Sequence, residues 1–209
     1  MCNTKLFFQH GCMASGKSLQ LLAMAHSLTE RGIRILILKP SIDNRDGENV
    51  IHSRALGDRE CVSVSPELDI YAFVGQLCGE ITERGINAPK WILVDEAQFL
   101  TEKQVDQLAS IVDDYRINIM CFGLRTDFQT HLFPGSKRLF EVADSISEIK
   151  SSCACGRKTI FNARIDQEGN IIRDGNQIEI GGDDKYIALC RHCYYQNNVG
   201  HCNSINNEQ

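Results

Sequence analysis

The chain has 209 residues, enough for one full domain and a small second one, and 43% of them are hydrophobic, which is ample for a buried core. Its net charge of −5 argues against a protein whose main task is to grip nucleic-acid phosphates. No stretch approaches the ~18 apolar residues that cross a bilayer, and the start lacks the pattern of a secretory signal. We therefore expect a cytoplasmic protein that contacts neither nucleic acid nor a membrane.

The first predicted element is a strand over residues 5–10, which leads into a complete G-x-x-x-x-G-K-[ST] motif and then a helical pattern over 18–31. Strand, glycine-rich loop and helix in this order are typical of a phosphate-binding loop. Lys17 can reach the β- and γ-phosphates of a nucleotide, and the Ser18 hydroxyl can bind Mg²⁺. The predicted ATP-binding loop consists of Gly11, Cys12, Met13, Ala14, Ser15, Gly16, Lys17 and Ser18.

Strand-like and helix-like segments continue to alternate along the chain. Apolar runs predict strands at 33–38, 91–95 and 117–123, amphipathic patterns predict helices at 65–84 and 101–115, and residues 41–53 are predicted to be a polar loop. Thr101 and Gln104 match a capping box at the start of the later helix. Buried strands that alternate with helices predict a parallel sheet covered on both faces. From this pattern together with the phosphate loop, we expect a P-loop NTPase fold of the RecA type.

Two adjacent carboxylates follow the strand predicted at 91–95. Four apolar residues before Asp95 and Glu96 form the pattern that completes a P-loop site, in which Asp95 can help to hold Mg²⁺. Glu96 could take a proton from an attacking water or alcohol, so these residues alone leave open an NTPase or a kinase. Asp43 and Arg45, in the polar loop, either support the transferring phosphoryl group or form a solvated surface pair.

The chain changes character after residue 150, where the alternation stops and glycines, cysteines and short polar turns take over. No Gly/Ser-rich or Pro-rich linker marks the change, so we expect the two parts to pack closely. An Asn-rich tail follows, with a composition that is typical of disorder. We predict an ATP-binding domain over 1–150, a zinc-binding domain over 151–195 and a disordered tail over 196–209.

Four cysteines in this second part form two close pairs, Cys153 with Cys155 and Cys190 with Cys193. Two such pairs separated by a loop predict a tetrahedral zinc site. Because the protein would fill all four coordination positions, the metal is expected to be structural. His192 is an alternative fourth ligand, and free thiols in a small core are the alternative to a metal.

Taken together, these motifs resemble the type II thymidine kinases, the family found in bacteria and in animal cytosol. The resemblance runs from the first strand to about Tyr194. It rests on the phosphate loop, on Asp95-Glu96-Ala97-Gln98-Phe99 in the family's D-E-x-Q-F form, on residues 123–133 and on residues 180–186. It implies a zinc-ribbon-like second domain with a loop, the lasso, that closes over the nucleoside, and transfer of the γ-phosphate of Mg-ATP to the 5′-hydroxyl of thymidine.

The resemblance also implies residue roles. Glu96 corresponds to the catalytic base, and Ser18 and Asp95 to the magnesium neighbourhood. The nucleotide site would add Asp95, Glu96, Ala97 and Gln98 to the phosphate loop. The nucleoside site would use the side chains of Met13, Phe99, Leu124, Phe128, Phe133 and Tyr186 and the lasso residues Gln177, Ile178, Glu179, Ile180 and Gly181. The family further implies a homotetramer, inhibition by the end product dTTP, and deoxyuridine as a second candidate nucleoside.

The residues themselves are compatible with a pyrimidine pocket. A pyrimidine ring has apolar faces and polar edges, which aromatic walls and backbone donors suit. Phe128 and Phe133 stand among polar residues, which predicts a loop with two aromatic side chains that need a role. Plain core packing of both rings is the alternative.

Two other classes of function account for parts of the sequence. A zinc-ribbon ATPase or GTPase acting on nucleic acid would use the same phosphate loop, but the sequence lacks the N-K-x-D segment that reads guanine. A non-catalytic zinc protein with a relict phosphate loop would not need Lys17, Ser18, Asp95 and Glu96 intact. The prediction is therefore a thymidine kinase that supplies dTMP for DNA precursor synthesis.

Overall fold

The structure is a computed structural model that describes residues 4–42, 49–53, 57–83, 85, 88–177 and 186–200. Its elements are β1 (Leu6–Gly11), α1 (Lys17–Glu30), β2 (Ile35–Pro40), β3 (Val50–Ser53), β4 (Gly57–Glu60), β5 (Val62–Val64), α2 (Ile70–Glu83), β6 (Trp91–Val94), the 3₁₀ turn η1 (Ala97–Phe99), α3 (Glu102–Tyr115), β7 (Asn118–Gly123), α4 (Pro134–Val142), β8 (Ser145–Ile149), β9 (Phe161–Ile165), β10 (Ile171–Ile172), β11 (Tyr186–Leu189) and α5 (Arg191–Tyr195). Within these residues, no helix is both long and apolar enough to cross a membrane.

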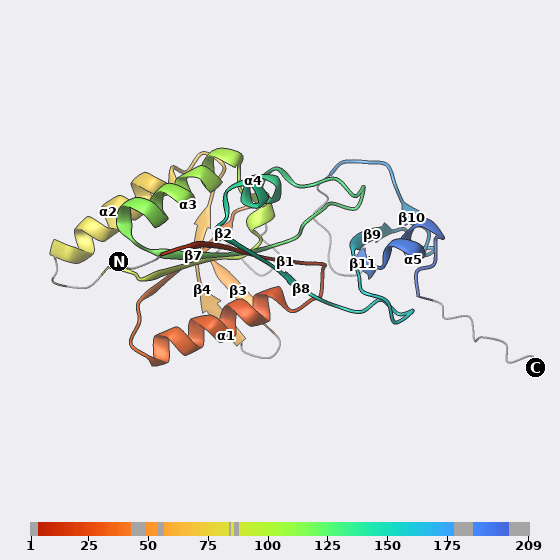
Figure 1. Cartoon of the computed structure of the whole chain (residues 1–209), viewed down its shortest axis with the longest axis horizontal. Coiled ribbons are helices and arrows are strands. Elements are labelled where there is room, and N and C mark those ends of the chain that lie inside the picture. The colour runs from red at the N-terminus through yellow and green to blue at the C-terminus, as the bar shows by residue number, and fades with distance from the viewer. Residues whose placement is uncertain are drawn as a thin grey trace, which may run out of the picture.

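A six-stranded sheet in the order β5-β2-β6-β7-β1-β8 forms the main body, and every pair of neighbouring strands in it is parallel. Helices α2, α3 and α4 cover one face, and α1 covers the other (Figure 1). The carboxyl ends of β1 and β6 therefore meet at the same edge of the sheet, separated only by β7. The predicted parallel sheet with helices on both faces is confirmed.

Both faces of the sheet are buried, which explains why its strands are continuous apolar runs. In β6, Ile92 and Val94 belong to the core under α2, α3 and α4, whereas Leu93 belongs to the core under α1. In β7, Ile119 and Phe122 divide between the same two cores. Because neighbouring residues of a strand point to opposite faces, each strand contributes to both layers.

Some predicted boundaries were wrong. The helix expected over 65–84 begins at Ile70, because Asp69 accepts a hydrogen bond from the Ala72 N–H (2.9 Å) and caps the helix there. Residues 50–53, expected in the polar loop, form β3, which pairs with β4 in an antiparallel hairpin. The strands β5 and β8 and the helix α4 were not predicted.

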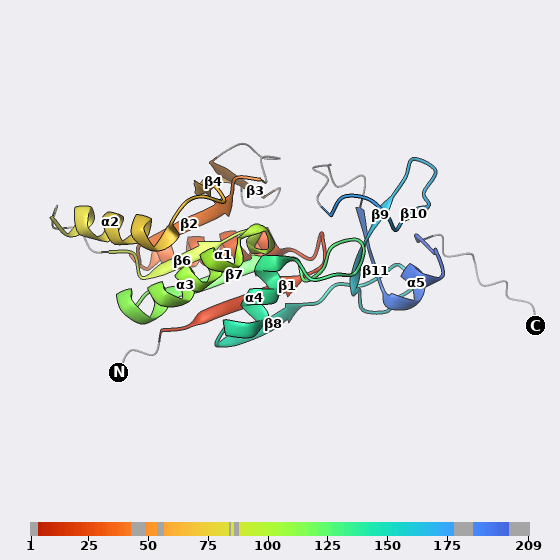
Figure 2. The same cartoon turned by 90° about the horizontal axis from the view of Figure 1, so that it is seen from above.

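A smaller unit follows β8, and we call residues 151–195 the cysteine module. Its sheet has the order β10-β9-β11 and is antiparallel. Figures 1 and 2 show this sheet and α5 together at the end of the molecule away from α2. Cys153, Cys190, Cys193 and Tyr194 help to form its own small core. A small zinc-ribbon-like domain was predicted here, and the structure shows a small antiparallel sheet with a cluster of four cysteines. The domain boundaries stay a prediction, and residues 201–209 of the tail lie outside the described residues.

Candidate active site

The phosphate loop bends sharply between β1 and α1. Gly16 has φ 86° and Ala14 φ 55°, so the backbone is left-handed at two points of the loop. At Gly11, an added Cβ would lie 2.9 Å from the Ile149 carbonyl oxygen, so only glycine fits there. Lys17 is buried, and its Nζ donates to the Cys12 carbonyl (2.9 Å), which holds the ammonium inside the curve of the loop. The first N–H groups of α1 face the same region, where an anion would bind.

Two oxygen-bearing side chains, those of Ser18 and Asp95, lie together next to this loop. The Ser18 hydroxyl donates to Asp95 Oδ2 (3.0 Å), and Asp95 is only 3% exposed. Burial and the neighbouring Glu96 carboxylate raise the pKa of Asp95 to about 7, against the lowering effect of hydrogen bonds from Ser18 and the Glu96 N–H. A hydroxyl and a buried carboxylate beside a phosphate site are oxygen donors of the type that Mg²⁺ takes. The donor set therefore fits this ion.

Glu96 stands at a strained position between β6 and η1, with φ 48° and ψ 38°. Non-glycine residues in this region cost about 1–3 kcal/mol and cluster at functional sites. Gln98, which is 1% exposed, donates from Nε2 to Glu96 Oε2 and accepts from the Leu124 N–H at Oε1 (2.9 Å). The side chain of Gln98 thus connects the predicted base with the segment that carries the predicted nucleoside contacts.

We call residues 124–133 the aromatic loop. Its Leu124, Phe128 and Phe133 are all buried, and the Phe133 ring lies edge-on to Phe99 with 5.6 Å between centroids. The Phe128 ring is 1% exposed, with the Arg164 guanidinium carbon 5.4 Å from its centroid. The structure therefore brings Phe99 and Phe133 together and buries Phe128 where the aromatic loop contacts Arg164 of the cysteine module.

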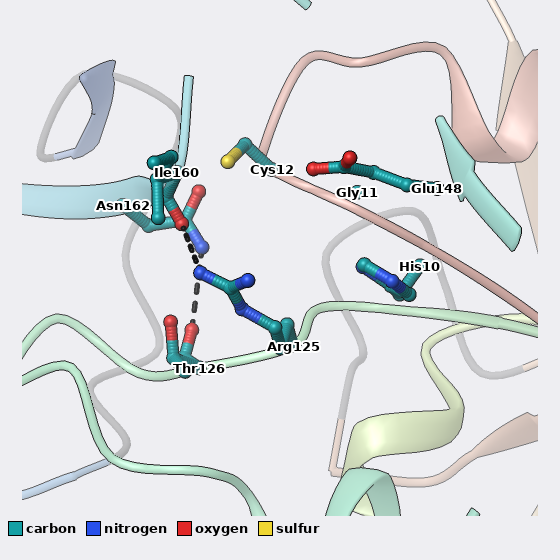
Figure 3. A pocket seen from close by; sticks show the side chains of 8 residues that line it. All are labelled: His10, Gly11, Cys12, Arg125, Thr126, Glu148, Ile160 and Asn162. Atoms are coloured by element: carbon teal, nitrogen blue, oxygen red, sulfur yellow. Dashed lines mark hydrogen bonds between the residues drawn. The ribbon is translucent and has the colours of Figure 1, made fainter. Parts of the chain in front are cut away.

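A link between the phosphate loop and the cysteine module was missed from the sequence. Asn162 of β9 accepts from the Met13 N–H (2.7 Å) and donates to the Thr126 carbonyl (3.3 Å). Figure 3 shows Asn162 beside Cys12 and Arg125. A polar residue inside the buried strand Phe161–Ile165 is the signal that could have found it.

A small hollow lies beside this link (Figure 3). Its volume is about 10 Å³, enough for one water molecule and far too small for a nucleoside. The hollow is lined by His10, Gly11, Cys12, Arg125, Thr126, Glu148, Ile160 and Asn162. Burial lowers the pKa of His10 in one wall of the hollow, against the opposite effect of Glu148, and so favours its neutral form.

The four predicted cysteines come together in the cysteine module. The sulfur atoms of Cys153, Cys155, Cys190 and Cys193 all lie within 4.8 Å of one another, and His192 is not part of the group. Burial opposes ionisation of Cys190, yet hydrogen bonds from the Cys193 N–H and from the other thiols lower its pKa to about 7. Four converging sulfur atoms fit a tetrahedral structural zinc ion.

The thymidine kinase family model matches residues 4–194. The chain belongs to the thymidine kinase family. It is 40% identical over 195 residues to a thymidine kinase of Lactobacillus johnsonii. The aligned residues cover 93% of this chain and 98% of that protein. The chain is 40% identical to one of Rhizobium meliloti (90% and 94% covered) and 42% identical to one of Idiomarina loihiensis (89% and 93%).

One solved structure has a distant similarity to this chain. It is described as the crystal structure of a DNA replication initiation factor, is 17% identical, covers 69% of this chain and 40% of its own, and superposes with a TM-score of 0.38. A similarity this distant supports no functional argument. The thymidine kinase prediction is confirmed by the family and the relatives.

The roles of single residues in this thymidine kinase stay predictions. Ser18 lies against Asp95, and Glu96 is the next residue, as predicted. Tyr186, at the start of β11, is half-buried, and Gln177 donates to Asp127 Oδ2 (2.8 Å). The remaining predicted residues lie outside the described part of the chain: Asp43, Arg45, Ile178, Glu179, Ile180 and Gly181.

Proposed function

We propose that this thymidine kinase transfers the γ-phosphate of ATP to the 5′-hydroxyl of thymidine, giving ADP and dTMP. The observation that carries the proposal is the junction at residues 95–99. Asp95 faces the phosphate loop through Ser18, and Phe99 faces the aromatic loop through Phe133. Glu96 stands between them, where a phosphate donor and a nucleoside acceptor would meet.

The phosphate loop would hold the donor. Backbone N–H groups at the start of α1 and the Lys17 ammonium would bind the β- and γ-phosphates. Lys17 already points into the curve of the loop, since its Nζ donates to the Cys12 carbonyl. Ser18 and Asp95 would hold Mg²⁺, which neutralises charge on the phosphates when bound.

Glu96 would act as the general base. The 5′-oxygen bonds to the γ-phosphorus while the bond from that phosphorus to the β–γ bridging oxygen breaks, and the hydroxyl proton passes to the Glu96 carboxylate. The hydrogen bond from Gln98 fixes the direction of this carboxylate. The strained backbone at Glu96 supports such a role, because the fold maintains a costly conformation there.

The nucleoside would lie against apolar side chains, with the pyrimidine edge bound by the backbone of the lasso. We propose Met13, Phe99, Leu124, Phe128, Phe133 and Tyr186 as the side-chain contacts, and residues 177–181 as the lasso. Closure of the lasso would exclude water and favour transfer to the nucleoside over hydrolysis of ATP.

The other proposals rest on the cysteine cluster, on the sequence and on the family. The four cysteines would hold a structural zinc ion, and the ATP-binding and zinc-binding domains would divide near residue 150. A homotetramer, inhibition by dTTP, activity on deoxyuridine and a cytoplasmic location complete the proposal.

A transfer assay tests the function directly. The protein is incubated with Mg²⁺ and ATP labelled at the γ-phosphate, in parallel with thymidine, deoxyuridine, deoxycytidine and deoxyguanosine. We expect labelled dTMP, with deoxyuridine the next acceptor and no product from deoxyguanosine. Label released only as inorganic phosphate, at a rate that thymidine does not change, would refute the proposal.

A further inference from the structure

Five consecutive residues of the aromatic loop, 125–129, are each hydrogen-bonded to the cysteine module. Each bond joins one loop residue to a module residue: Arg125 Nη2 donates to Ile160 O (3.2 Å), Asn162 Nδ2 to Thr126 O (3.3 Å), Gln177 Nε2 to Asp127 Oδ2 (2.8 Å), Tyr194 Oη to Phe128 O (2.7 Å) and Gln129 Nε2 to Arg173 O (3.3 Å). Residues 125–129 of the loop are therefore all attached to the module.

The bond from Tyr194 is the shortest of the five and is buried at both ends. Tyr194 is 2% exposed and Phe128 is 1% exposed, so water has little access to replace the bond. A buried carbonyl that loses its partner costs more than a hydrogen bond contributes. The Tyr194 hydroxyl is thus the contact whose loss the loop can least compensate.

The cysteine cluster determines where the Tyr194 ring lies. Tyr194 follows Cys193 directly, and its N–H donates to the Cys190 carbonyl (3.0 Å). The Phe161 ring centroid is 4.9 Å from that of Tyr194, and the Arg173 guanidinium carbon lies 4.5 Å from the Tyr194 centroid. Arg173 also donates to the Tyr194 carbonyl (2.7 Å), so the ring is held on several sides.

We propose that Tyr194 is a positioning residue for nucleoside binding, through which the cysteine cluster fixes the aromatic loop. The inference rests on the proposed function, because Leu124, Phe128 and Phe133 are nucleoside contacts only in that proposal. Tyr194 acts on the nucleoside through the loop and does not touch the reacting atoms. Its loss therefore weakens thymidine binding and leaves ATP binding and the zinc ion in place.

The test compares Tyr194→Phe with Tyr195→Phe. Tyr194→Phe removes one hydroxyl and keeps the packed ring. Tyr195 is the next residue and is 58% exposed, so its variant is a matched control. Steady-state kinetics give the KM for thymidine and for ATP separately, and elemental analysis gives the zinc content.

For Tyr194→Phe we expect the thymidine KM to rise about 10-fold, with the ATP KM within about twofold of wild type and the zinc content unchanged. Tyr195→Phe should match the wild type in all three. An unchanged thymidine KM in Tyr194→Phe would overturn the proposal. So would a joint rise of both KM values with loss of zinc, because the hydroxyl would then serve general stability.

Amide hydrogen exchange separates this inference from the proposed function. In Tyr194→Phe, peptides that cover residues 125–131 should exchange at least about 10-fold faster, while peptides from β6 and β7 keep the wild-type rate. This measurement needs no substrate. If the wild-type protein failed to phosphorylate thymidine, the proposed function would be refuted. Hydrogen exchange at residues 125–131 would still decide whether Tyr194 holds the aromatic loop in place. Equal exchange in both proteins would refute the link.

Discussion

Gln98 offers a sharp test of the candidate base, since its amide bridges a carboxylate and a backbone N–H. Its Nε2 donates to Glu96 and its Oε1 accepts from the Leu124 N–H. Gln98→Glu keeps the shape and the acceptor but places a second carboxylate against Glu96. Two like charges about 3 Å apart repel by roughly 5 kcal/mol at an effective dielectric constant of about 20. The pair relieves most of this repulsion by binding a proton.

Proton binding raises the apparent pKa of the carboxyl pair in the variant by at least about one. A base with a raised pKa stays protonated to higher pH, so the acid limb of kcat should move upward by the same amount. At a given pH on that limb, the variant should turn over about 10-fold more slowly than wild type, and its activity should recover as pH rises. The assay is kcat from about pH 5.5 to 9 at saturating thymidine and ATP.

Gln76→Glu is the matched control, because Gln76 donates to Glu80 (2.8 Å) on an exposed face of α2 and the change is chemically the same. Its acid limb should coincide with that of wild type. Gln98→Met should lower kcat by about 10- to 100-fold across the whole pH range, since it leaves the buried Leu124 N–H unpartnered and removes the hydrogen bond to Glu96. An acid limb of Gln98→Glu that coincides with wild type would refute the reasoning, because Glu96 would then not be the group that titrates.

Three further predictions follow from the same geometry. Glu96→Gln should keep the dissociation constant for ATP, measured by calorimetry, within about twofold of wild type. It should lower the rate of phosphoryl transfer at least ~100-fold, the scale for loss of a general base. Near-normal turnover would exclude Glu96 as the base. Removal of zinc by a strong chelator should weaken thymidine binding, because the cysteine cluster holds the module to which the aromatic loop is bonded; unchanged thymidine affinity in zinc-free protein would contradict this. Gly79→Ala should raise the free energy of unfolding, measured by urea titration, by about 0.5–1 kcal/mol, since a Cβ at residue 79 meets open space. Gly75→Ala should raise the free energy of unfolding by less, because its Cβ would lie 2.5 Å from Tyr115 Oη. A larger gain at Gly75 would show that packing does not control the difference.

The parts of the fold that the sequence predicted are those with strong local signals. In the phosphate loop, the backbone at Gly16 is left-handed (φ 86°), a requirement of the loop itself. The capping box at α3 also depends on neighbours only, and both of its hydrogen bonds are present, from Gln104 N to Thr101 Oγ1 (3.2 Å) and from Thr101 N to Gln104 Oε1 (3.1 Å). The four cysteines carry their spacing in the chain. Such features can be predicted because each depends on a few residues that lie close together in the sequence.

The parts that were missed depend on contacts between distant segments. Helix α4 begins Pro134-Gly135-Ser136, a composition that is typical of a turn. Glycine stands there because a Cβ at Gly135 would lie 2.6 Å from the Leu100 carbonyl and 2.7 Å from that of Ala97. That requirement comes from η1, more than thirty residues earlier. The roles of Asn162 and Tyr194 likewise exist only once the cysteine module packs against the main sheet.

The D-E-x-Q-F motif has a physical explanation in this packing. The left-handed turn at Glu96 starts η1, which lies between β7 and α4, and Ala97 is fully buried there. A Cβ at Gly123 would lie 2.8 Å from Gln98 Oε1, so glycine at the end of β7 leaves room for the Gln98 amide.

The side chains of this motif then point toward defined partners. Asp95 meets Ser18, Gln98 turns back to the Leu124 N–H, and Phe99 meets Phe133. Asp95 precedes the left-handed turn at Glu96, and Gln98 and Phe99 follow it within η1, so the motif reaches the phosphate loop on one side of the turn and the aromatic loop on the other. A one-residue insertion within 95–99 would rotate Gln98 and Phe99 away from the aromatic loop while leaving Asp95 at the phosphate loop. The spacing of the motif is thus the condition for joining the two halves of the site.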